Sequence, residues 1–176
     1  ADSGAPAGNE ADMPPPRKFE DASRWHIGEP DVVVQLKKEV LVKAAAPDYW
    51  ADLDLEDLGL KTDRYIQAIE VKPVKGVKVI HHAVAQSRYE DENCNSHVGL
   101  LEEYAVGKFG DIYANETGRL IKAGTQAYVN VHLHASGKDE MVQLALGITY
   151  YPLGHTPKPI EKVAHVGDNE DFDMPA

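Results

Sequence analysis

Apolar and polar residues alternate strictly in the stretch AYVNVHLHA, residues 127–135. The apolar positions are Ala127, Val129, Val131, Leu133 and Ala135, and the positions between them are Tyr128, Asn130, His132 and His134. Successive side chains of a β-strand point to opposite faces, so this pattern predicts a half-buried strand. On such a strand His132 and His134 lie on the same face.

Other apolar runs, separated by turn residues, predict most of the remaining strands. The predicted strands cover 31–36, 40–46, 63–72, 76–86, 118–123, 126–135 and 141–151, and one interpretation of 48–62 adds an edge strand. We expect Pro73 to end the strand 63–72, and the apolar positions of 141–151 to share one face. With few helix signals, the pattern predicts an all-β, jelly-roll-like antiparallel β-sandwich of about eight strands.

The sandwich is expected to span residues 31–160, between an extended N-terminal segment and a C-terminal tail of residues 161–176. Residues 1–30 are rich in Pro, Gly, Ala and acidic residues, and Pro14-Pro15-Pro16 favours an extended conformation. This composition predicts a linker or wrapping arm. Trp25 and Ile27 are its candidate anchors to the body.

Two segments have weaker patterns. Residues 87–117 predict a long irregular excursion with a short helix over 98–104. Residues 48–62 alternate acids and leucines, which fits either a calcium loop or a solvated edge strand and turn. Gly59 is the only glycine there and no bidentate glutamate follows it at the expected place, so the edge strand is favoured.

Composition and charge exclude some classes of protein. The chain has 176 residues, is 43% hydrophobic and carries a formal net charge of −11. Without a basic cluster, nucleic acid is not an expected partner. The sequence contains no run of eighteen apolar residues, so no transmembrane segment is expected. The single cysteine, Cys94, is either free or paired between chains.

The eight histidines carry the candidate chemistry. His81-His82 forms a second cluster inside the apolar run VKVIHHAVA. Adjacent residues of a regular strand point to opposite faces, so both rings reach one metal only if the strand twists strongly, bulges or ends there. A shared metal with the 132/134 strand and a polar stripe on an open sheet face remain as alternatives. We expect structural roles for His26, His155 and His165, and leave His97 open.

If a metal binds, three imidazoles without a thiolate or adjacent carboxylate suit copper or zinc better than calcium or magnesium. The spacing does not choose between copper and zinc. A hydrolytic zinc enzyme is disfavoured, because neither cluster has a neighbouring Glu or Asp to act as general base. Asn130, Tyr128 and Gln86 are candidate partners for the outer ring nitrogens.

Several stretches together suggest a family. The chain resembles the amino-terminal copper domain of the type II, ascorbate-dependent copper monooxygenases, which include peptidylglycine α-hydroxylating and dopamine β-monooxygenase, and above all their bacterial relatives. The similar stretches are IGEPDVVVQL, TDRYIQAIEVKPVKGVKVIHHAVA, YAVGKFGDIYANETGRLIKAGTQAYVNVHLHASGK and LALGITYYPLGHTPK, which cover roughly residues 25–160.

The resemblance implies one copper ion, rather than zinc, in a domain that serves as an electron reservoir. It implies His81, His82 and His132 as ligands, with His134 as a fourth-ligand or second-sphere candidate. It also implies a periplasmic or otherwise extracytoplasmic location. No residue is predicted to be catalytic, because oxygen and substrate meet at a second copper domain in that family.

We expect that second domain to be missing, since forty-two residues follow His134 and Met174 has no histidines around it. Whether the chain alone is an enzyme therefore stays open. The expected partners are other protein subunits or a separate second domain. The alternative function is a structural or accessory subunit of a larger extracytoplasmic complex, with an empty or vestigial metal site.

Overall fold

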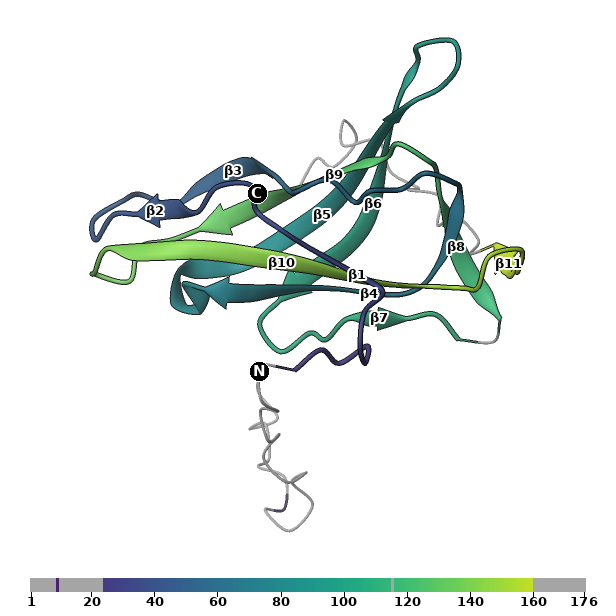
Figure 1. Ribbon diagram of the computed structural model, residues 1–176. Helices are drawn as coiled ribbons and strands as arrows, with labels where there is room; N and C mark the ends of the chain where they lie inside the picture. Colours follow the sequence, from purple (N-terminus) through teal and green to yellow (C-terminus); the bar gives the residue numbers. More distant parts are fainter. Residues whose placement is uncertain (1–8, 10–23, 115, 160–176) are drawn as a thin grey trace, which may run out of the picture.

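The computed structural model describes residue 9 and residues 24–114 and 116–159. Two antiparallel sheets pack face to face into a β-sandwich (Figure 1), which confirms the predicted fold class. The eleven strands of the described residues are β1 (Val32–Gln35), β2 (Val40–Val42), β3 (Tyr49–Asp54), β4 (Arg64–Lys75), β5 (Ile80–Glu90), β6 (Ser96–Ala105), β7 (Asp111–Ile112), β8 (Thr117–Ile121), β9 (Gln126–Leu133), β10 (Glu140–Tyr150) and β11 (Lys158–Pro159). The surplus over the predicted eight consists of the short strands β7 and β11 and of β6, which lies in the segment predicted to be irregular.

One sheet has seven strands, in the order β1-β10-β4-β8-β11, with β2 paired to β10 and β7 to β4. The other has four strands, in the order β3-β9-β5-β6. Aliphatic side chains from both sheets fill the space between them, and Ile69, Leu146, Val129 and Val131 are fully buried there. The four-stranded sheet leaves its outer face open, so β9 keeps the alternation that its sequence predicts.

Strand β10 is buried on both faces, whereas the sequence pattern predicted one buried face. Trp25 and Pro30 of the N-terminal segment lie against β10 at Gly147, where an added Cβ atom would be 2.8 Å from Cζ3 of Trp25 and 2.9 Å from Cγ of Pro30. Lys72 lies over the indole of Trp25 at 4.3 Å from the ring centroid. Trp25 therefore contacts the body as expected. Pro14-Pro15-Pro16, His165, Met174 and the tail 161–176 lie outside the described residues.

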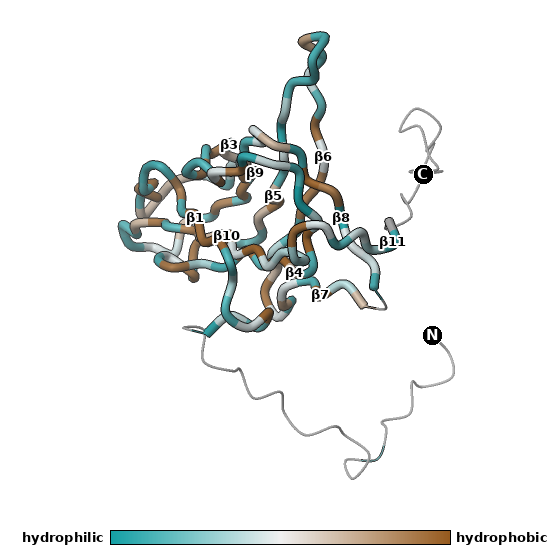
Figure 2. Tube along the Cα trace, turned by 45° about the vertical axis from the view of Figure 1, so that its right-hand side comes forward, coloured by the Kyte–Doolittle hydropathy of each residue, from teal (hydrophilic) through white to brown (hydrophobic). Residues whose placement is uncertain are grey.

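Two predictions about secondary structure were wrong. β4 continues through Pro73 to Lys75, because Pro73 lies at a register irregularity opposite Leu144, where a ladder hydrogen bond is not required. Residues 98–104 form part of strand β6 and not a helix. The expected irregular excursion is largely a β5–β6 hairpin that extends away from the body (Figure 2). No residue of its outer part, 87–100, is buried, so no alternation is needed there.

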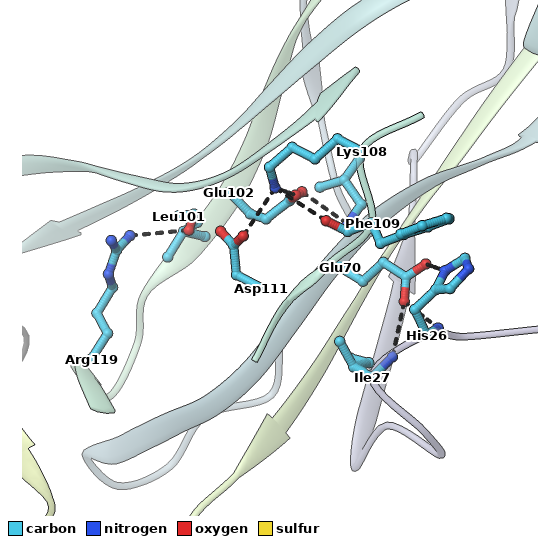
Figure 3. A network of polar contacts seen from close by, with 10 residues as sticks. His26, Ile27, Glu70, Leu101, Glu102, Lys108, Phe109, Asp111 and Arg119 are labelled. Carbon is cyan, nitrogen blue, oxygen red and sulfur yellow. Dashed lines mark hydrogen bonds and ion pairs between the residues drawn. The ribbon is translucent and has the colours of Figure 1, made fainter. Parts of the chain in front are cut away.

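Polar contacts lock the loop after β6 against β4 (Figure 3). Glu102 is 3% exposed and accepts hydrogen bonds from the Val71 backbone N–H at 3.0 Å and from Lys108 Nζ. Lys108 also pairs with Asp111 at 3.1 Å. On the outer face of β4, Glu70 accepts hydrogen bonds from the backbone N–H groups of His26 and Ile27, at 2.7 and 3.3 Å.

Burial raises the pKa of Glu102 to about 7 from its ordinary 4.5, although the hydrogen bond from Lys108 opposes this. Between these two values the folded state holds a proton that the unfolded state has lost, so this group's contribution to stability falls as the pH rises. Glu102→Gln keeps the carboxamide neutral throughout. We expect the unfolding free energy of Glu102→Gln, relative to the parent protein, to rise by about 2 kcal/mol between about pH 5 and about pH 7.

Urea unfolding of the metal-free protein at several pH values measures this difference. Asp63→Asn is the matched control, because hydrogen bonds from Lys122 and the Ala123 backbone hold the pKa of Asp63 below its ordinary value and outside this window. A difference for Glu102→Gln that stays constant with pH would contradict the assignment.

Candidate metal centre

Three histidines from two neighbouring strands meet on the open face of the four-stranded sheet. One ring nitrogen from each of His81, His82 and His132 lies within 4.8 Å of the other two, and we call this group the three-nitrogen cluster. The Nδ1 atom of His81 is 3.0 Å from Nδ1 of His132 and 3.1 Å from Nδ1 of His82. This is the convergence that the sequence left as one of two alternatives.

A bulge in β5 makes this convergence possible. Ile80 pairs with Leu133 and His82 pairs with His132, so His81 is an extra residue opposite a single step of β9. In a regular strand the two adjacent histidines would face opposite sides of the sheet. With the bulge, Ile80 stays in the core and both rings lie on the outer side. The 3₁₀ turn η2 (Val77–Val79) leads the chain into this position.

Hydrogen bonding alone does not satisfy this arrangement. A neutral imidazole has one N–H and one lone pair, and each Nδ1 carries only one of them. Because Nδ1 of His81 faces two other Nδ1 atoms, it must share either one proton or one lone pair between both contacts. A cation in their midst would use a lone pair from each ring, and metal–imidazole bonds of about 2 Å are compatible with nitrogens separated by 3.0–3.1 Å.

The surroundings favour the metal-binding form of the His82 ring. Burial and the neighbouring His81 and His132 lower the pKa of His82, which favours the neutral ring at neutral pH, while the Glu103 carboxylate opposes this shift. On the outer side of His132, Nε2 lies 3.7 Å from an Asp48 carboxylate oxygen. A carboxylate beside the outer nitrogen fixes the orientation of a metal-binding imidazole.

Trp50, from edge strand β3, covers part of the cluster and was missed by the sequence analysis. It pairs with His132 across the β3–β9 ladder and stacks on that ring, with centroids 4.9 Å apart and planes 10° apart. It meets the edge of the His82 ring at 4.7 Å. The only signal in the sequence is its position in the alternating segment YWADLD, which does not show that β3 pairs with β9 and brings Trp50 onto His132.

The other predicted residues lie apart from the three-nitrogen cluster. The His134 ring is 6.2 Å from that of His81, and its backbone N–H binds the Val79 carbonyl. The expected outer partners pair elsewhere, since Asn130 binds Asp52 and the Tyr128 hydroxyl binds Gln86. His26, His97 and His155 each pair with a carboxylate, from Glu70, Asp91 and Glu116 respectively.

Residues 48–62 follow the edge-strand interpretation. Tyr49–Asp54 is strand β3 at the edge of the four-stranded sheet, and Asp57 accepts a hydrogen bond from the Gly59 backbone. In the described part of the chain, the three histidines form the one group of His, Cys, Asp and Glu side chains whose geometry suits a metal ion. No helix of the described residues is long and apolar enough to cross a membrane.

Comparisons with models of known protein families, with curated proteins and with solved structures find no match for this chain.

Proposed function

We propose that this chain is a copper-binding β-sandwich domain that serves as a one-electron reservoir, like the amino-terminal domain of the ascorbate-dependent copper monooxygenases. The observation that carries the proposal is the convergence of three imidazole nitrogens across the β5–β9 ladder. A copper ion held there would store one electron by cycling between Cu(II) and Cu(I). The domain is assigned no catalytic residue and would work with a second copper-bearing domain or subunit.

The donor set supports copper or zinc as the ion. Three imidazoles without a thiolate suit these borderline metals, and the Asp48 carboxylate lies 3.7 Å from Nε2 of His132, the ring nitrogen that does not meet His81. The family resemblance favours copper and an extracytoplasmic location. Competition between copper and zinc for the purified protein tests the choice, and a preference for zinc under reducing conditions would refute the reservoir role.

Copper is expected to stabilise the fold, because the folded state presents the three nitrogens together and the unfolded chain does not. At a free copper concentration of about 100 times the dissociation constant, the gain in unfolding free energy is about 2.7 kcal/mol. Thermal unfolding with and without copper measures it. A shift of equal size in a variant lacking His81, His82 and His132 would show that the effect arises elsewhere.

His134→Ala is expected to weaken copper binding by about tenfold, the lower end of the loss for a second-sphere group, since its ring lies outside the three-nitrogen cluster. Equilibrium competition with a chelator of known affinity provides the measurement. A loss as large as that from removing His132 would make His134 a ligand and contradict this assignment.

A structural subunit with an empty site is the second candidate function, and the projecting β5–β6 hairpin favours it. Val98 and Leu100 are 60% and 55% exposed on β6, as expected of a surface that contacts another protein. Under this alternative the three histidines have no metal-dependent role. Replacing them would then leave copper binding, and the stability measured with copper present, unchanged.

A further inference from the structure

Trp50 presents an exposed aromatic surface directly beside two of the candidate ligands. It is 51% exposed, although it contacts the rings of His132 and His82 on its other side. Tryptophan is enriched where proteins dock, since a large rigid ring provides much contact area. It therefore offers a docking partner an exposed aromatic ring that contacts two of the candidate ligands.

The charged side chains placed beside Trp50 by two cross-strand rows and by Asp48 are all acidic. The register of the sheet places Trp50, His132, His82 and Ala105 in one cross-strand row. The next row on the same face contains Asp52, Asn130, Val84 and Glu103, and both acidic residues are exposed. Asp48, whose side chain is 70% exposed, lies beside His132. Neither row contains a lysine or arginine.

We propose that the surface formed by Trp50, Asp48, Asp52 and Glu103, here called the Trp50 face, is where the bound copper exchanges electrons with a cationic one-electron redox protein. This rests on the proposed copper site and adds the kind of partner. With copper held by His81, His82 and His132, the reduced partner would give one electron to Cu(II) to form Cu(I), and no atom or proton would be transferred. A basic partner fits because opposite charges steer the two surfaces together.

The same charges act against an anionic donor. With a net charge of −11 and three carboxylates around the indole, the field at the Trp50 face repels anions, including the ascorbate anion. Electrostatic steering changes association rates by factors of about 10 to 1,000 and weakens as salt screens the charges. The sign of the salt effect therefore reports which charge the face accepts.

The first experiment needs no copper and tests the surface. The chain has two tryptophans, and Trp25 lies on the other sheet beside Gly147, so it is an internal control. We titrate the metal-free protein with the inert paramagnetic cation hexaamminechromium(III) and follow both indole N–H signals by NMR, assigned with Trp50→Phe. The Trp50 signal should broaden first, and the triple variant Asp48→Asn, Asp52→Asn, Glu103→Gln should remove most of this preference. Equal broadening of both signals would overturn the proposal.

The second experiment tests electron exchange with the copper-loaded chain. The Cu(I) form is oxidised in a stopped-flow instrument by cationic tris(phenanthroline)cobalt(III) or by an anionic cobalt(III) chelate. For each reagent, the rate at high ionic strength is compared with its own rate at low ionic strength. Raising the ionic strength from about 20 mM to about 300 mM should slow the cationic reagent about tenfold and accelerate the anionic one. The triple variant should reduce both salt effects. Salt effects of equal sign for both reagents, or unchanged effects in the variant, would overturn the Trp50 face.

These outcomes separate the two claims. Stoichiometric copper with no charge dependence refutes the Trp50 face and leaves the copper site intact. A chain that binds no copper refutes both, whatever the NMR titration shows. Trp50→Phe keeps an aromatic ring at the position, so loss of copper in that variant would show that the indole supports the site itself and does not act as a docking surface.

Discussion

His132→Ala is expected to lower the affinity for copper at least about 100-fold, the largest effect predicted for any single substitution in this chain. His132 supplies the Nδ1 atom that meets His81 from the neighbouring strand, and it alone joins β9 to the cluster. Without it, β5 alone offers two imidazoles at the bulge, His81 and His82. Competition with a Cu(I)-specific chelator measures the change.

His97→Ala and His155→Ala are the matched controls for this prediction. Each of these histidines pairs with a carboxylate and stacks on a tyrosine, His97 on Tyr89 and His155 on Tyr151, at sites apart from the cluster. Both variants should bind copper like the parent protein. If His132→Ala did so too, the three-nitrogen cluster would not be the copper site.

Gly76→Ala is expected to destabilise the fold by about 3 kcal/mol, the largest effect on stability predicted for a glycine. Gly76 has φ +71°, and an added Cβ atom would lie 2.6 Å from the Met141 carbonyl oxygen and 2.9 Å from Cγ2 of Val142. It precedes the turn η2, which leads into the β5 bulge. Strain there would also displace His81, so copper affinity should fall together with stability.

Gly124→Ala separates backbone strain from the steric clash. Gly124 has a similar φ of +73°, but an added Cβ atom would meet nothing within 4 Å. Its cost should be about 1 kcal/mol, the penalty for an alanine in the left-handed region. Urea unfolding of both variants provides the comparison. Equal destabilisation of the two variants would mean that the clash of the added Cβ atom at position 76 with Met141 and Val142 of β10 is relieved at little cost.

The sandwich and half of the candidate site are readable from the sequence, for reasons that particular residues make clear. The alternation of 127–135 survives because β9 lies in a sheet with one open face, so His132 is outward by pattern alone. The adjacency of His81 and His82 also implies that both rings can reach one metal only if the strand bulges, twists strongly or ends there. That the bulge falls at His81 is set by the pairing with Leu133 and His132, which a single strand's sequence does not contain.

The remaining features depend on contacts between distant segments. Trp50 is an ordinary edge-strand residue until β3 pairs with β9 and brings it onto His132. The two-sided burial of β10 depends on Trp25 lying across Gly147. The outer part of the β5–β6 hairpin, residues 87–100, contains no buried residue, so nothing there requires apolar and polar positions to alternate. Local patterns predict faces of strands but not their neighbours.

Elemental analysis of the purified full chain, loaded with copper and freed of excess metal, tests the copper site most directly. The account predicts one copper ion per chain in the parent protein and essentially none in the variant that replaces His81, His82 and His132 by alanine. Equal copper in the two proteins, or a parent protein that retains none, would contradict it.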